Sequence, residues 1–142
     1  MTVSEPTGVG PRVGLGFDVH PTQPGRALWL AGVRFEGEDG LSGHSDGDVV
    51  CHAIADALLG SAALGDLGQH FPETDPDVEG IGGADVLRRV AALVRSAGFA
   101  PASTDAADFV GDSVHVSTQN IVDTSILKPS GAIKVPRRDA YP

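Results

Sequence analysis

The stretch RVGLGFDVH, residues 12–20, alternates apolar residues with glycine, aspartate and histidine. A period of two predicts a β-strand, because successive side chains of a strand point to opposite faces. One face carries Val13, Leu15, Phe17 and Val19, and the other carries Gly14, Gly16, Asp18 and His20. We expect the apolar face to lie on a core and the other face to place a carboxylate beside an imidazole.

The remaining sequence predicts further strands, helices and turns after this strand. The sequence predicts a turn at 21–25, a strand at 28–35 closed by a turn at 37–40, a helix at 46–64, a loop at 65–77, a helix at 85–97, and strands at 114–119 and 130–135. Ser45 and Asp48 resemble a capping box for the first helix. The second helix is expected to stop at Gly98 and to turn five apolar residues inward, namely Val86, Leu87, Val90, Leu93 and Val94.

Length and composition limit the possible functions. A chain of 142 residues fits one domain with a real core. The net charge of −9 argues against a nucleic acid or an anionic membrane as the main partner. The single cysteine, Cys51, excludes an internal disulfide framework and is typical of a reducing compartment. With neither a signal-peptide pattern nor an apolar run of about 18 residues, the expected location is the cytoplasm.

The composition changes along the chain. Up to Gly111 there are six arginines, no lysine and sixteen acidic residues, giving a net charge of −10. The remaining residues carry two lysines, two arginines and three acids, giving +1. We therefore expect a flexible leader at 1–11, a domain at 12–111 and an atypical tail at 112–142.

Candidate chemistry lies where the first strand and the first helix meet. His52 has Asp48 and Asp56 four residues away on either side, near one helix stripe. Asp18, His20 and His52 would make a plausible catalytic zinc site with a free fourth position, although the ligand types also suit Mn²⁺ or Fe²⁺.

Plainer interpretations stay open for each residue. An Asp-x-His spacing arises by chance, and His52 alone fits a half-buried helix histidine. Ser45 and Asp48 fit a helix cap, and His44 fits either a surface residue or an anion contact at a helix start. Asp66 and the F-P-E-T-D-P run fit turns.

Taken together, three segments carry a specific resemblance. RVGLGFDVH, GLSGHSDGDVVCHAIADALLGSAALGDLGQHFPETDP and the helix that follows resemble the 2-C-methyl-D-erythritol 2,4-cyclodiphosphate synthase family from Arg12 to about Asp105. The most specific elements are H-S-D-G-D with a second histidine eight residues after the first, then A-L-G-D and F-P-x-T-D-P.

The resemblance implies an activity and a fold. The family cyclises 4-diphosphocytidyl-2-C-methyl-D-erythritol 2-phosphate with release of CMP, in non-mevalonate isoprenoid biosynthesis. Its subunits are α/β, a two-layer sandwich of a mixed sheet with helices on one face, and they assemble as a homotrimer. Matched residue by residue, Asp18, His20 and His52 would bind Zn²⁺, and His44 would stabilise the transition state.

Further site residues follow from the same resemblance. The implied substrate contacts are Asp18, Val19, His20, His44, Ser45, Asp66, Leu67, Gly68, Phe71, Pro72, Glu73, Thr74 and Asp75. The loop between Gly65 and Gly68 is expected to be flexible enough to close over substrate. A second divalent cation, Mg²⁺ or Mn²⁺, is also implied.

The C-terminal third departs from the family pattern. The family has an A-x-x-P-K-type loop, T-T-x-E and G-F-T-G-R-x-E-G there, and this sequence contains none of them. These segments hold the cytidine pocket and the ligand of the second cation. Two functions are therefore open, an active cyclase and a catalytically impaired metal- or phosphate-binding remnant of the family.

Overall fold

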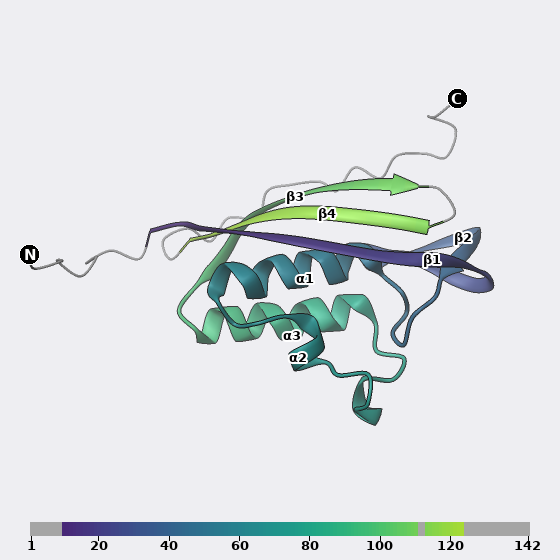
Figure 1. Ribbon diagram of the computed structural model, residues 1–142, viewed down its shortest axis with the longest axis horizontal. Helices are drawn as coiled ribbons and strands as arrows, with labels where there is room; N and C mark the ends of the chain where they lie inside the picture. The colour runs from purple at the N-terminus through teal and green to yellow at the C-terminus, as the bar shows by residue number, and fades with distance from the viewer. Residues whose placement is uncertain (1–9, 111–112, 124–142) are drawn as a thin grey trace, which may run out of the picture.

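A four-stranded sheet is covered on one face by helices in the computed structural model, which describes residues 10–110 and 113–123 (Figure 1). The elements in chain order are β1 (Arg12–Leu30), β2 (Val33–Leu41), α1 (Val49–Ala62), α2 (Leu67–His70), the 3-10 turn η1 (Pro76–Val78), α3 (Gly83–Ser96), β3 (Ala100–Val110) and β4 (Ser113–Asp123). The expected two-layer α/β class is confirmed. Within the described residues, no helix has the length and apolar character needed to cross a membrane.

The strand order is β2-β1-β4-β3, and all three neighbouring pairs are antiparallel. The expectation of a mixed sheet is therefore wrong for the described strands. The reason is topological: the helical segment joins β2 to β3, which lie at opposite edges, so it creates no parallel pair.

The strand predicted at 114–119 exists and is longer, since β4 pairs with both β1 and β3. Part of the segment expected as a tail thus lies inside the sheet. The division into leader, domain and tail stays a prediction, and the strand predicted at 130–135 lies outside the described residues.

The first two strands form a hairpin that the sequence misplaces. Instead of turning at 21–25, β1 continues to Leu30 with an irregular register between Gln23 and Ala27. The strand predicted at 28–35 is broken by a two-residue turn at Ala31 and Gly32, where φ is 54° and 76°. Two positive φ angles are typical of the tight turns that match strand twist. The turn expected at 37–40 lies within β2.

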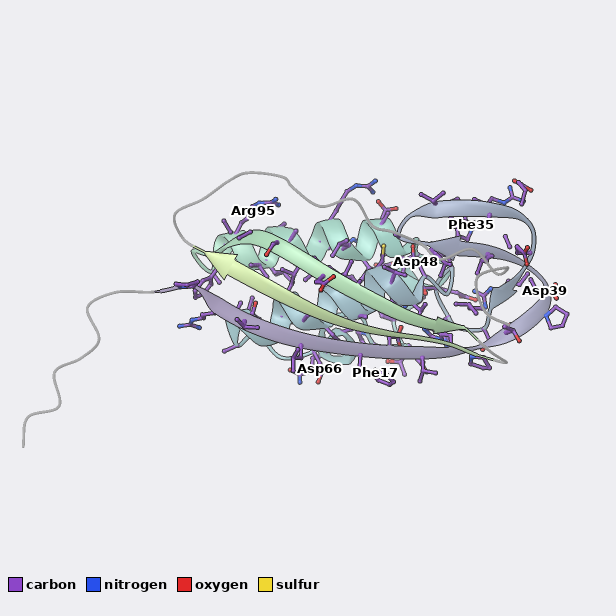
Figure 2. The ribbon with its side chains drawn as sticks, turned by 90° about the horizontal axis from the view of Figure 1, so that it is seen from above. Phe17, Phe35, Asp39, Asp48, Asp66 and Arg95 are labelled. Atoms are coloured by element: carbon purple, nitrogen blue, oxygen red, sulfur yellow. The ribbon has the colours of Figure 1, made fainter. Side chains whose placement is uncertain are left out.

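The face of β1 that packs on the helices is the glycine face. A Cβ on Gly14 would lie 1.9 Å from the carbonyl oxygen of Ala57, so only glycine fits there. The expectation that the apolar face points inward is wrong, since its members lie on the open face and are 41–73% exposed: Val13, Leu15, Phe17 and Val19. Figure 2 looks onto this face and labels Phe17 on β1. The predicted alternation is correct, but the face that packs against α1 is the one with Gly14 and Gly16, because only a face without bulky side chains lets the helix come so close.

The core lies between the sheet and the two long helices, and most of its fully buried residues come from α1 and α3. On α3, Val86, Val90 and Val94 are buried, Leu87 is partly buried, and Leu93 is 38% exposed, so the prediction is wrong for Leu93. The helix ends at Ser96, and Gly98 adopts φ +86°, which confirms the predicted stop.

Asp48 joins the start of α1 to the β1–β2 turn. Its side chain is fully buried and accepts hydrogen bonds from the backbone N–H groups of Ala31 (2.8 Å), Gly32 (2.6 Å) and Cys51 (3.0 Å). Asp48 is thus the N-cap of α1, which begins at Val49 rather than at 46. Ser45 takes no part in this cap, so the predicted capping box is replaced by one carboxylate that also fixes the turn.

Candidate metal centre

The glycine face of β1 leads directly into the site. Gly14 and Gly16 bring the strand against α1, and Asp18 and His20 follow on the same face. His52 lies on the first turns of α1, so its ring reaches the same point from the helix side. The close approach of strand and helix therefore sets the separation across which the three side chains meet.

The three polar side chains converge on one another. The Oδ2 atom of Asp18 lies 3.0 Å from Nε2 of His20 and 3.2 Å from Nδ1 of His52. The two imidazole nitrogens are 3.4 Å apart. The side chains are only 14–24% exposed, so the cluster is sheltered but still accessible. Among the residues that the structure describes, this is the group of His, Cys, Asp or Glu side chains that could hold a metal ion.

The donor separations fit a tetrahedral metal ion. Four ligands at about 2.0–2.1 Å from Zn²⁺ lie roughly 3.3–3.4 Å from one another in that geometry. The observed 3.0, 3.2 and 3.4 Å match this triangle with small adjustments. Imidazole nitrogen with carboxylate oxygen is also a donor set that zinc accepts. The cluster could therefore hold one such ion and leave a fourth position open.

Asp18 and the two histidines of the cluster are close enough to shift pKa values within it. Burial raises the pKa of the Asp18 carboxyl, but hydrogen bonds and charges from His20 and His52 lower it by more, so it lies well below its usual range. The hydrogen bond to Asp18 is the largest reason why the pKa of His20 is raised, against the opposing effect of burial. Asp18 is thus an anion at neutral pH, as a ligand carboxylate must be.

A hydrogen bond from outside the cluster orients the His52 ring. The Ser45 hydroxyl lies 3.1 Å from Nε2 of His52, which leaves Nδ1 facing the cluster. Ser45 Oγ also accepts a hydrogen bond from the Gly47 N–H, at 3.1 Å. A hydrogen bond with the backbone of Ser42 also helps to raise the pKa of His20. A contact to the second ring nitrogen, such as the one between Ser45 and His52, is what fixes a histidine ligand in metal sites.

The other predicted site residues occupy the rim and the loop beyond it. His44 is exposed, and its Nδ1 lies 3.6 Å from Oε1 of Glu73, so the structure brings these two together. Val19 lies beside the cluster only through its backbone, because its side chain points to the open face of the sheet.

The segment predicted as an open loop is partly helical. Asp66 caps the short helix α2, which contains Leu67 and Gly68, and accepts a hydrogen bond from the Gln69 N–H at 3.0 Å. Asp56 of α1 accepts the Leu67 N–H at 2.8 Å, and burial raises the pKa of Asp56. The predicted loop is thus anchored to the helix that carries His52.

The F-P-E-T-D-P run continues from α2. Phe71 packs against the core, Asp75 caps η1, and three residues between them are exposed: Pro72, Glu73 and Thr74. The turn interpretation of this run is therefore correct for Asp75, whose side chain accepts from the Asp77 N–H at 2.9 Å.

Sequence reasoning missed Arg26. Its guanidinium donates hydrogen bonds to the carbonyl oxygens of Gly43 (2.8 Å) and Ser45, next to the cluster. Nothing in the sequence marks a lone arginine after Pro-Gly as a partner of a loop seventeen residues away.

The fold and the cluster define a class of protein: a two-layer α/β domain with a His-His-Asp candidate metal centre between its first strand and first helix. Comparison with known proteins then gives the family. The sequence profile of the YgbB family matches residues 11–118, and the chain belongs to that family.

Two curated relatives are similar to the chain. One, the 2-C-methyl-D-erythritol 2,4-cyclodiphosphate synthase of Porphyromonas gingivalis, is 55% identical over 95 residues, which cover 67% of this chain and 59% of the relative. A second protein of that name, from Syntrophobacter fumaroxidans, is 56% identical over 94 residues, covering 66% of this chain and 59% of the relative. The chain thus aligns with 59% of the length of these relatives.

A solved structure titled as 2C-methyl-D-erythritol-2,4-cyclodiphosphate synthase superposes with a TM-score of 0.74. It is 26% identical, and the alignment covers 79% of this chain and all of that chain.

Proposed function

We propose that this protein is a cyclodiphosphate synthase, a phosphorus–oxygen lyase of non-mevalonate isoprenoid biosynthesis. It would convert 4-diphosphocytidyl-2-C-methyl-D-erythritol 2-phosphate to 2-C-methyl-D-erythritol 2,4-cyclodiphosphate and CMP. The observation that carries the proposal is the convergence of Asp18, His20 and His52 within 3.4 Å, in a chain that is 55% identical over 95 residues to a protein of that name.

In this proposal the three converging side chains hold Zn²⁺. When bound, the ion would supply Lewis-acid stabilisation of phosphate charge. The deprotonated Asp18 and the orientation of His52 by Ser45 support this assignment, since a ligand carboxylate must be ionised and a ligand imidazole must be fixed. A second divalent cation, Mg²⁺ or Mn²⁺, is proposed from the family, and this sequence offers no recognisable ligand for it.

The reaction needs positioning more than proton transfer. An oxygen of the 2-phosphate forms a bond to the β-phosphorus, the bond from that phosphorus to the bridging oxygen breaks, and CMP leaves with the electron pair. The nucleophile is already an oxyanion, so no general base is required. We propose that the exposed His44 ring and the Ser45 hydroxyl contact the diphosphate, which is supported by the 3.1 Å contact between the Ser45 hydroxyl and Nε2 of His52.

Two loop segments would surround the methylerythritol part of the substrate. These are Asp66–Gly68 and Phe71–Asp75, which follow each other around α2. The contact between His44 and Glu73 supports the proposal, because it places the second segment beside the residue proposed to meet phosphate.

Assembly is proposed as a homotrimer in the cytoplasm. The open face of the sheet, formed by Val13, Leu15, Phe17 and Val19, is the kind of apolar surface that a partner subunit covers. The atypical sequence after residue 111 is expected to weaken this assembly.

The alternative is a remnant that binds metal or phosphate without efficient turnover. It is favoured by the lack of the family's T-T-x-E and G-F-T-G-R-x-E-G segments, which would position CMP and the second cation. Misplacing a reacting group by about 1 Å costs about 10²-fold, and losing a charge-stabilising contact costs on the order of 10²–10³-fold.

The test is CMP formation from the diphosphocytidyl substrate with Zn²⁺ and Mg²⁺ present. We expect one bound zinc per chain and slow but detectable CMP formation, lower by at least ~10³-fold than in a complete relative; undetectable CMP formation with zinc bound would favour the remnant. A rate of CMP formation within tenfold of that relative would contradict the expected loss of catalytic activity. Absence of zinc binding by the folded chain would contradict the proposed site itself.

A further inference from the structure

The backbone of residues 43–45 is held at three consecutive carbonyl groups. Arg26 donates from Nη1 to the Gly43 oxygen at 2.8 Å and from Nη2 to the Ser45 oxygen. Between them, the His44 oxygen accepts a hydrogen bond from the Gly80 N–H at 2.9 Å. A segment outside any helix or strand is thereby fixed on both sides of His44.

The guanidinium suits this task better than other side chains. It is planar and presents its donors as a rigid fork, so one group can hold two carbonyl oxygens at once. The ammonium group of a lysine is a point charge that would hold one of them firmly. Hydrogen bonds from charged donors are also stronger than those between neutral groups.

The backbone of β1 around Arg26 is also held in place. The strand is irregular between Gln23 and Ala27, and Gly25 adopts φ +79°. The Gly25 N–H is tied to Oδ1 of Asp39 at 3.0 Å, which fixes the irregular segment against β2. The segment that holds Arg26 is therefore itself held in place.

The side chains on the clamped segment depend on this backbone. The His44 ring is exposed and contacts Glu73 at 3.6 Å, too far to fix its position. The Ser45 hydroxyl lies 3.1 Å from Nε2 of His52 and so links the segment to the cluster. Displacing the carbonyls would displace the imidazole and the hydroxyl together.

We propose that Arg26 is a positioning residue that holds His44 and Ser45 at the rim of the Asp18–His20–His52 cluster for contact with a phosphate group. The phosphate part of this inference rests on the proposed function, whereas the positioning part does not. Arg26 holds this segment through its backbone carbonyls, and its positive charge also acts on His20, whose pKa it lowers.

The first readout is hydrogen exchange of the Gly80 amide in metal-free protein, because that amide bonds the carbonyl between the two that Arg26 holds. We expect Arg26→Met to lower its protection about tenfold, relative to amides of α1. Arg26→Lys should have a smaller effect, since one carbonyl stays bound. Arg34→Met is the matched control, because Arg34 pairs with Glu36 on β2 and is exposed.

The second readout is binding of inorganic phosphate to the zinc-loaded protein. We expect affinity to fall about tenfold in Arg26→Met while zinc stoichiometry is unchanged, because Arg26 bonds none of the three metal-cluster side chains. Arg34→Met should change neither quantity.

Wild-type exchange at Gly80 in both Arg26 variants would overturn the positioning role, and so would loss of zinc in proportion to loss of global stability. If the wild-type chain binds no zinc, the proposed function fails, and the Gly80 readout still decides the role of Arg26. Altered exchange with unaltered phosphate affinity would overturn the phosphate part alone.

Discussion

Gly16 lies so close to Ala53 that a Cβ on the glycine would come within 1.9 Å of the alanine carbonyl oxygen. This contact joins the first half of β1 to α1 at Ala53, the residue that directly follows His52 on the helix. The separation of strand and helix at this point fixes the distance that the Asp18, His20 and His52 side chains must bridge.

Replacing Gly16 by alanine should therefore push β1 away from α1. We expect Gly16→Ala to lower the free energy of unfolding by about 3 kcal/mol or more, because backbone atoms cannot yield as a flexible side chain can. Urea unfolding measures this change. Gly60→Ala is the control, since Gly60 is an exposed helix glycine with nothing within 4 Å of the added Cβ, and it should stabilise the protein by up to about 1 kcal/mol. Similar stabilities for the two variants would refute the close contact.

Asp48 should be needed as a carboxylate and not merely as a polar residue. Its Oδ1 accepts from Ala31 and Cys51 and its Oδ2 accepts from Gly32, so an amide group would direct N–H toward N–H. We expect Asp48→Asn to cost roughly 2–3 kcal/mol of unfolding free energy. Asp39→Asn, at an exposed carboxylate with one N–H partner, should cost no more than about 0.5 kcal/mol. Equal costs at the two sites would count against this account of the turn.

Metal binding should depend on each imidazole of the cluster. We expect His20→Ala and His52→Ala each to abolish stoichiometric zinc binding, measured by metal analysis after equilibrium dialysis, because two remaining ligands hold zinc weakly. His70→Ala should keep full stoichiometry, since Nε2 of His70 lies 2.8 Å from the Leu64 carbonyl oxygen and His70 is not part of the cluster. Retained zinc in His52→Ala would place the site elsewhere.

The metal-free protein should gain stability from the cluster in a defined pH window. The lowered pKa of Asp18 contributes stability that is present above about pH 4 and lost on acidification. The raised pKa of His20 contributes stability that is present below about pH 6.5 and lost as the pH rises through its folded value. The difference in unfolding free energy between wild type and Asp18→Asn, measured in chelator, should be largest at about pH 5–6. A difference that does not vary between pH 5 and 9 would contradict this coupling.

The open apolar face of the sheet should govern self-association. Leu15 is 73% exposed on β1, and an aspartate there would put charge into any interface formed on this face. We expect wild-type protein to form a weak or heterogeneous trimer and Leu15→Asp to be monomeric, by light scattering over a dilution series. Glu36→Asp, an exposed change on β2, should behave as wild type. A sharp wild-type trimer that survives dilution would contradict the expected weakness.

The sequence predicted the cluster better than it predicted the sheet. Alternation in residues 12–20 placed Asp18 and His20 on one face correctly, because a strand period of two leaves no other choice. It did not say which face packs on the helices. Apolar residues usually do, but here the glycines allow the helix backbone to approach, and this depends on contacts with residues forty positions away.

Local signals also failed where tertiary contacts decide. Pro-Gly predicted a turn at 21–25, yet β1 continues through these residues. Its irregular segment stays in the sheet because it pairs with β2 and because the Gly25 N–H donates to Asp39. The real turn, at Ala31 and Gly32, is fixed by the carboxylate of Asp48 from another element. The role of Arg26 was hidden for the same reason, since its partners belong to a distant loop.

The position of β4 between β1 and β3 has a consequence for how the chain reaches this structure. Arg12 pairs with Val122 and Pro21 with Ser113, so the strand carrying Asp18 and His20 gains its second neighbour only from the far end of the sheet-forming sequence. Such non-local pairing raises contact order, and high contact order slows folding to milliseconds or longer. While β4 is still being synthesised, β1 has one unpaired edge next to its exposed leucine and phenylalanine. We expect this nascent stage, rather than the finished fold, to be where the chain is most exposed to aggregation and most in need of a chaperone.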